Sequence, residues 1–194
     1  MDFATYEQYF QSILNGEITN APYDNPAYMN YTKLNWTRQQ RWLKTGEMNA
    51  DLISLVMQVK QPQRWILITE PWCGDAAHIL PFIHKLSQIN PLITLDIQLR
   101  DSEPYLIDSY LTGASRSKSI PKLVIRNSEE QDLVVWGPRP QENQELFEQM
   151  KGDKRDMEEI KLLLQKWYND DKGRSLQHEL LEALTPVFGS YTGQ

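Results

Sequence analysis

The sequence predicts an α/β fold, and two observations support this class. An apolar run at residues 65–68, rich in β-branched and aromatic side chains, is too short for a helix and suits a strand buried on both faces. Directly after it, a pattern with helical spacing begins near Cys73, and strand and helix patterns then alternate up to a hairpin. We therefore expect a sheet with helices packed against it.

The composition bounds the function classes. A chain of 194 residues suits one domain, or one domain with appendages, and can bury a real core. Hydrophobic residues make up 40%, and the mean hydropathy is −0.57, which is typical of a soluble globular protein. The net charge of −6 argues against a protein that binds nucleic acid or anionic membranes over its whole surface.

The location is predicted from the first residues and from cysteine usage. Residues 1–5 contain neither the basic nor the apolar stretch of a secretion signal, and no apolar run approaches membrane length. The single cysteine fits a reducing compartment. We expect a cytoplasmic protein with no membrane and no nucleic acid among its partners.

Residues 1–60 are predicted to form a helical extension that packs on the core. Helices are expected at 2–14, 33–44 and 49–59, with 20–26 as a loop. The second helix carries Lys and Arg side chains interleaved with Trp36 and Trp42, a composition that can bind nucleic acid. In an acidic chain, the solvated face of a covering helix is the better interpretation.

Residues 61–170 are predicted to be the core domain. Its expected elements are a strand at 65–68, a helix from 73 to 86, a strand at 92–97, a helix at 105–111, hairpin strands at 122–126 and 133–136, and two helices after Pro140. Residues 171–194 are predicted to be a C-terminal appendage. It should contain a helix at 175–185 with Ser175 as its N-cap.

Cys73 is the candidate reactive group. The first N–H groups of a helix lack partners and carry a partial positive charge, so the helix start should favour a thiolate. Asp75 follows two residues later, in the first turn. Its carboxylate competes for the same N–H groups, which should push the pKa of the thiol back up.

Residues 72–75, Trp-Cys-Gly-Asp, follow a buried strand and resemble the active-site motif of the thioredoxins. Pro81 lies inside the next helix, where thioredoxins carry a kink-forming proline. Residues 119–125 look like the loop and strand that place a cis-proline, here Pro121, against the active cysteine. The likeness is strongest to poorly characterised bacterial thioredoxin-like proteins. It implies a thioredoxin fold, a three-layer α/β/α arrangement with a mixed sheet, here extended by helices at both ends.

The departures from the family pattern concern the step in which a second cysteine would resolve the mixed disulfide. Ala76 stands where thioredoxins have their second cysteine, and Leu67 stands where they keep a buried acid that accepts its proton. The chain has one cysteine, so it cannot form an internal disulfide. The usual dithiol activity is therefore not expected.

Two functions remain open. In the first, Cys73 is the catalytic residue of monothiol exchange with protein or peptide thiols and disulfides, with glutathione as a co-substrate in place of a bound cofactor. In the second, the protein is redox-inactive and binds a protein or peptide in the groove beside Cys73 and Pro121. In either case the resemblance implies a substrate-binding surface formed by Trp72, Gly74, Asp75, Ile120 and Pro121.

Other candidate sites are weaker. His78 and His84 are six residues apart, whereas a metal-binding pair on a helix needs a spacing of three or four, so no metal site is expected. Arg139 lies between two prolines. We interpret it as a salt-bridge partner, and the alternative is an anion contact near the motif.

Overall fold

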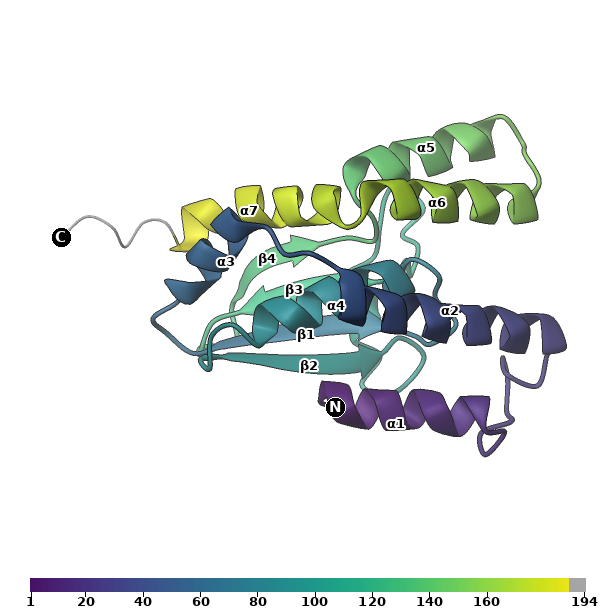
Figure 1. Ribbon diagram of the computed structural model, residues 1–194, viewed down its shortest axis with the longest axis horizontal. Coiled ribbons are helices and arrows are strands. Elements are labelled where there is room, and N and C mark those ends of the chain that lie inside the picture. Colours follow the sequence, from purple (N-terminus) through teal and green to yellow (C-terminus); the bar gives the residue numbers. More distant parts are fainter. Residues whose placement is uncertain (189–194) are drawn as a thin grey trace.

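The computed structural model describes residues 1–188 of the chain. These residues form seven α-helices, one 3-10 helix and four strands (Figure 1). In chain order the elements are α1 (Phe3–Leu14), α2 (Pro26–Thr45), α3 (Ala50–Met57), β1 (Gln63–Thr69), α4 (Ala76–Ser87), β2 (Ile93–Leu99), η1 (Leu106–Ser109), β3 (Lys122–Arg126), β4 (Asp132–Trp136), α5 (Gln141–Gly152), α6 (Met157–Asp171) and α7 (Arg174–Phe188).

The sheet is mixed, as the resemblance implied. Its strand order is β2-β1-β3-β4. β1 pairs in parallel with β2, whereas β3 is antiparallel to both of its neighbours. The parallel pair is connected through α4, since parallel strands need a crossover, and the last two strands form the predicted hairpin.

The central strand β1 is buried on both faces. Trp65 and Leu67 belong to one apolar cluster, and Ile66 and Ile68 belong to another. This separation follows from the period of two in a strand, which points successive side chains to opposite faces. The continuous apolar run was therefore a correct signal for a central strand.

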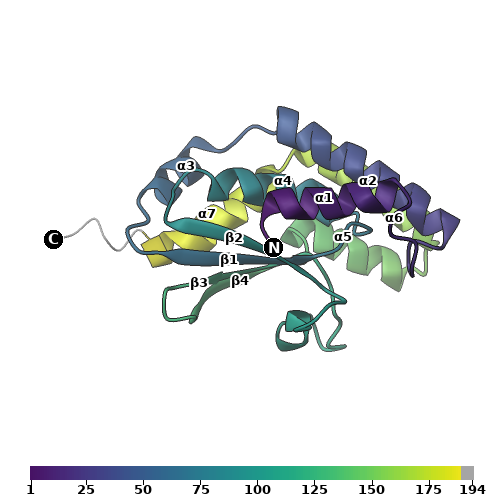
Figure 2. The same ribbon diagram turned by 90° about the horizontal axis from the view of Figure 1, so that it is seen from below.

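One face of the sheet carries the helices (Figure 2). Apolar side chains of α1, α3, α4 and α7 join Trp65 and Leu67 in the larger core cluster, and α2 adds Trp42. α5 and α6 lie beside one another near the end of the sheet at which β1 and β2 finish (Figure 1). The helices predicted outside residues 61–170 thus pack on the core, while the domain limits themselves remain a prediction.

The opposite face is covered more thinly, by η1 and the loops around it (Figure 2). A helix was predicted over residues 105–111, but only one 3-10 turn forms. Tyr105 adopts a left-handed conformation with φ 54°, so helical geometry starts only at Leu106, and Tyr110 ends it. Ile107 still reaches the cluster of Ile66 and Ile68, so the burial was predicted correctly and the length was wrong.

Two helix starts also differ from the prediction. α2 begins seven residues before the predicted residue 33, because Asn25 caps the Ala27 N–H at 2.9 Å and Pro26 occupies the first helical position. Ser175 is not an N-cap but lies inside α7, where its hydroxyl donates to the Asp171 carboxylate. The last six residues of the predicted appendage lie outside the described part of the chain.

Within residues 1–188, no helix is both long and apolar enough to cross a membrane.

Candidate functional site

The motif forms a turn between β1 and α4. The Cys73 N–H donates to the Glu70 carbonyl at 3.0 Å, which closes the turn, and α4 starts at Ala76. The Ile120–Pro121 peptide bond is cis, as the resemblance implied. This brings the loop before β3 against the motif, with the Cys73 Sγ 3.4 Å from the Ile120 carbonyl oxygen.

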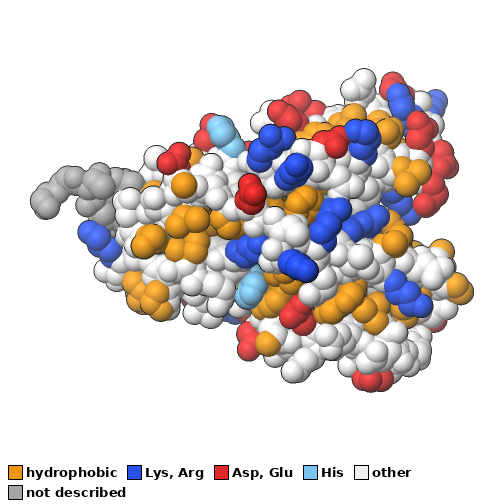
Figure 3. All heavy atoms as spheres, in the orientation of Figure 1, with side chains coloured by type: hydrophobic (Ala, Val, Ile, Leu, Met, Phe, Trp, Pro, Cys, Tyr) orange, Lys and Arg blue, Asp and Glu red, His pale blue; other side chains and the backbone are white. Residues whose placement is uncertain are grey.

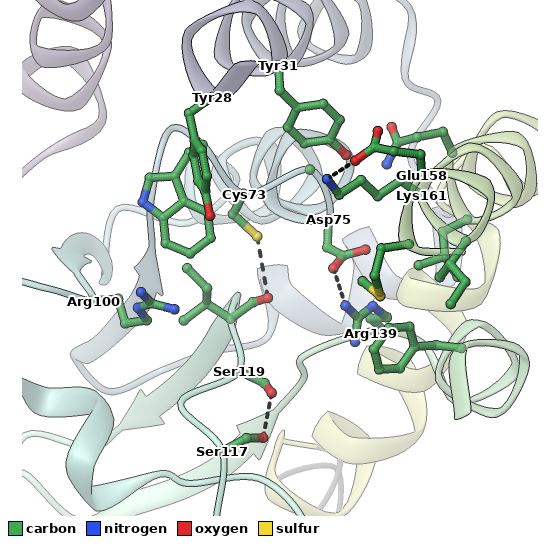
Figure 4. A pocket seen from close by; sticks show the side chains of 18 of the residues that line it. Tyr28, Tyr31, Cys73, Asp75, Arg100, Ser117, Ser119, Arg139, Glu158 and Lys161 are labelled. Carbon is green, nitrogen blue, oxygen red and sulfur yellow. Dashed lines mark hydrogen bonds and ion pairs between the residues drawn. The ribbon is translucent and has the colours of Figure 1, made fainter. Parts of the chain in front are cut away.

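A pocket of about 750 Å³ opens beside this contact (Figure 4). Of the residues predicted to bind substrate, Trp72, Gly74, Asp75 and Ile120 line it together with Cys73. Pro121 is buried and is not part of the pocket wall. The remaining walls come from α2, α5, α6, the loop after β2, the loop before β3 and Arg139 in the segment between β4 and α5. The helices beyond the core therefore help to build the pocket.

The Cys73 thiol is held in its protonated form. The residue is 6% exposed and packs among apolar side chains that include Ile66, Ile68 and Ile107. Burial, and then the negative charge of Asp75, raise the pKa of the thiol from 9.0 to about 12. The N–H groups of Ala76 and Asp75 and the charge of Arg139 lower this pKa, but they are outweighed. The prediction that the helix start favours a thiolate is wrong here, because burial has the larger effect.

The Asp75 carboxylate binds outside its own helix. It forms an ion pair with the Arg139 guanidinium at 2.7 Å (Figure 4). It also accepts a hydrogen bond from the Tyr168 hydroxyl at 3.0 Å. It caps no N–H group of α4, so the predicted competition for these N–H groups is wrong, whereas the predicted rise of the thiol pKa caused by Asp75 is confirmed. The interpretation of Arg139 as a salt-bridge partner is confirmed. Three segments far apart in sequence therefore meet at Asp75.

Arg139 is held in place by three groups. Besides Asp75, the Gln144 side chain accepts from its guanidinium at 3.0 Å, and the Phe147 ring lies 4.3 Å from it. Such a fixed planar group is suited to a buried ion pair, since its donors match a carboxylate. The Asp75–Arg139 pair thus connects the motif to α5.

Helix α2 covers the motif from the other side. The Asn35 amide, which is fully buried, donates to the Pro71 carbonyl at 3.1 Å. The Tyr31 hydroxyl lies against Gly74, where an added Cβ would be only 2.2 Å from the hydroxyl oxygen. Only glycine fits at position 74 while Tyr31 keeps this place.

His78 has a structural role. The Trp42 indole N–H donates to Nδ1 at 2.8 Å, so Nε2 carries the proton and donates to the Gln165 side-chain oxygen at 2.6 Å. The ring stacks on Tyr168, and burial lowers the pKa of His78 to about 3. Both ring nitrogens are occupied. Among residues 1–188, no group of three or more potential ligand side chains could hold a metal ion.

Sequence reasoning missed several residues of the pocket wall. Arg100 directly follows β2, and the carboxyl ends of parallel strands meet at one edge of a sheet, so its position next to the motif could have been inferred. Tyr28 in α2 and Lys161 in α6 lie on helices outside the segment that carries the resemblance. No pattern in the sequence connects them to the motif.

A family profile described as thioredoxin matches residues 22–151, more than half of the chain. The chain belongs to the thioredoxin family. The matched range includes α2, so it contains Tyr31 as well as the motif and Ile120. No curated protein matches the chain.

Two solved structures resemble this thioredoxin-family chain. One is a protein of unknown function from Pseudomonas aeruginosa, with a TM-score of 0.50, 15% identity, and coverage of 84% of this chain and 87% of that chain. The other is an HIV epitope-scaffold, with a TM-score of 0.48, 14% identity, and coverage of 97% and 96%. At such identities the likeness concerns the fold alone.

Proposed function

We propose that this protein is a redox-silent member of the thioredoxin family that binds a protein or peptide segment in the pocket beside Cys73 and Ile120. One observation carries the proposal: the thiol is buried and donates its proton to the Ile120 carbonyl. A thiol is nucleophilic as the thiolate, and this arrangement favours the protonated form. Ala76 supplies no second sulfur.

The pocket is suited to a segment with mixed character. Its volume of about 750 Å³ falls within the range of ligand sites. Ile120, Phe147 and Leu164 supply apolar contact area, while Ser117 and Ser119 present hydroxyl groups that hydrogen-bond each other at 2.7 Å.

We place the protein in a reducing cytoplasm, and the likeness of residues 72–75 to bacterial relatives supports a bacterial origin.

Titration of the thiol tests this proposal. An aromatic disulfide reagent is added at pH 7.5 to the native protein and to the protein unfolded in urea. We expect one equivalent of thiol to react rapidly after unfolding and at least about a hundredfold more slowly before it, because the pKa of the buried thiol is raised to about 12. Rapid native reaction would overturn the redox-silent assignment.

Monothiol exchange is the second candidate, and the position of Cys73 in the wall of an open pocket favours it. The Cys73 thiolate would attack the glutathione sulfur of a mixed disulfide and release the substrate as a thiolate. A second glutathione thiolate would then attack the bound glutathione sulfur, which yields oxidised glutathione and frees Cys73. Glutathione-dependent reduction that is lost in Cys73→Ser would support this candidate. Neither the binding function nor monothiol exchange should give turnover driven by a thioredoxin reductase.

A further inference from the structure

The charge of the pocket wall differs from that of the chain. Four basic side chains from four separate segments line the pocket, Arg100, Lys118, Arg139 and Lys161, against two carboxylates, Asp75 and Glu158. The chain as a whole has a net charge of −6. The excess of basic groups is therefore local, and a cleft lined by one sign of charge attracts ligands of the other sign.

Each of the two carboxylates has a basic partner that also belongs to the pocket wall. Asp75 is buried with Arg139 and the Tyr168 hydroxyl, and Glu158 pairs with Lys161 at 2.6 Å. These contacts leave Arg100 and Lys118 as the basic groups of the wall whose counter-ions lie outside the pocket. Asp101 and Asp108 are those counter-ions, and neither belongs to the pocket wall.

Both of these cations are available to a ligand. Lys118 and Asp108 are each about half exposed, and an exposed ion pair of this kind is worth little and exchanges readily. Arg100 binds Asp101 through Nε and Nη2, and no partner within residues 1–188 accepts from its Nη1. A carboxylate in the pocket would thus meet the two N–H groups of Arg100 Nη1 and the loosely paired ammonium group of Lys118.

Aromatic side chains lie next to Arg100. The Arg100 guanidinium stacks over the Trp72 ring at 4.5 Å, and the Tyr28 ring contacts Trp72 edge-on. Tyr28 and Met157 are 46% and 51% exposed. Large apolar side chains exposed at the rim of a pocket are typical of binding surfaces.

The wider surface around α2 and α6 has the same mixed character. Basic side chains gather over α2, whose charged residues are all basic, with hydrophobic side chains between them, whereas α6 carries more carboxylates than lysines (Figure 3). The helices lie side by side, since the Lys161 ammonium sits over the Tyr31 ring and Arg41 donates to the Asn169 side chain. A partner bound in the pocket would continue onto a surface of complementary charge.

We infer that the pocket recognises an acidic and apolar segment of a partner protein, in which a carboxylate side chain pairs with Arg100 and Lys118 and an adjacent aromatic or aliphatic side chain packs on Trp72 and Tyr28. This inference rests on the proposed function, because it specifies the chemistry of the segment that the pocket binds. The charge complementarity of the wall and the exposed rim carry it together.

Selection from a random peptide library displayed on phage tests the inference with the full chain. We expect the enriched peptides to combine Asp or Glu with Trp, Phe or Leu, and a synthetic copy of one of them to bind at least about tenfold more tightly than its copy with Gln or Asn at every acidic position. Tenfold corresponds to about 1.4 kcal/mol. Binding of the acidic copy should weaken as salt is added.

Variants connect the charge preference to the pocket. Arg100→Gln combined with Lys118→Gln should abolish the preference for the acidic copy. The matched control, Lys60→Gln combined with Lys172→Gln, removes two exposed charges that lie outside both the pocket wall and α2, and it should keep the preference. Ser119→Trp, which fills the pocket, should abolish binding of both copies. Melting temperatures close to that of the wild type establish that each variant is folded.

The possible outcomes separate the inference from the proposed function. Enriched peptides that are neutral or basic, and that Ser119→Trp no longer binds, would overturn the inference and leave peptide binding intact. An acidic preference that survives in the Arg100 and Lys118 variant would also overturn it. If no peptide is enriched over the Ser119→Trp protein, the proposed function itself is wrong.

Discussion

Cys73 and Asp75 lie two residues apart and are almost equally buried, at 6% and 8% exposure, but the fold surrounds them differently. The thiol donates to one carbonyl and packs among apolar side chains, and the N–H groups of Ala76 and Asp75 and the charge of Arg139 do not outweigh its burial. The carboxylate has a guanidinium and a phenol hydroxyl. Burial without a neighbouring cation favours the neutral form of an acid, whereas a neighbouring buried cation stabilises the ionised form.

This difference shows that the motif makes its strongest polar contacts through Asp75 and not through Cys73. In a thiol catalyst the positive groups at the motif should stabilise the sulfur anion. Here Arg139 pairs with Asp75, and the thiol proton is used in a hydrogen bond to Ile120. Through the contacts of Asp75, the motif thus connects α5 and α6 to the start of α4.

The largest effect is expected when Asp75 loses its cation. Arg139→Met keeps much of the side-chain volume but leaves a buried carboxylate with only the Tyr168 hydroxyl. Removing one partner of a buried ion pair typically costs about 3–5 kcal/mol. Urea unfolding at pH 7 measures this loss. The double variant Arg139→Met with Asp75→Asn should recover part of it, and a double variant no more stable than the single one would contradict the importance of the pair.

A smaller effect is expected at Glu70, a buried acid in the same loop that has no salt bridge within residues 1–188. Its Oε1 accepts from the Asp101 N–H at 3.0 Å, and burial raises the pKa of Glu70 from 4.5 to about 7. The folded state then holds a proton that the unfolded state releases. Stability contributed by protonated Glu70 is present below pH 4.5 and is lost as pH rises to about 7.

Glu70→Gln should remove this loss, since the amide oxygen can still accept from Asp101. A raised pKa of this size corresponds to on the order of 3 kcal/mol, so the variant should be more stable than the wild type at pH 8 by up to about that amount. At pH 4.5 the two proteins should differ little. Unfolding free energies at both pH values check the prediction, with exposed Glu103→Gln as the control. An equal gain in the free energy of unfolding at both pH values would show that ionisation of Glu70 does not cause the effect.

The sequence predicted those parts of the fold that depend on local pattern. The apolar run of β1, the hairpin and the loop at Ile120 follow from residue types and spacing over a few positions. The partners of Asp75 do not, because Arg139 and Tyr168 are brought to it only by packing of the whole chain. The pKa of Cys73 was misjudged for the same reason, since a helix start is visible in the sequence and burial is not.

The smallest effect is expected on the pKa of the thiol itself. Asp75→Asn removes a negative charge that raises the pKa of Cys73 and leaves Arg139 in place, so this pKa should fall by about half a unit to one unit. It should remain above its ordinary value of 9.0, because burial is the larger cause. The pH dependence of Cys73 alkylation in the native protein measures the shift.

Glu158→Gln is the matched control, since it removes another carboxylate of the pocket wall that is not among the main causes of the raised pKa of Cys73. An unchanged midpoint in Asp75→Asn would mean that Asp75 does not control the charge state of the sulfur. Cys73 and Asp75 would then differ only in the side chains packed around them.

The contact between Gly74 and Tyr31 constrains how this sequence can vary over evolution. A methyl group at position 74 and a phenol at position 31 cannot occupy the same space, so neither residue can change freely while the other stays. Among relatives that keep α2 over the motif, a larger side chain at position 74 should occur together with a smaller one at position 31. A helix residue that precedes the Trp-Cys-Gly-Asp motif by about forty residues thus limits which side chains relatives can carry at position 74.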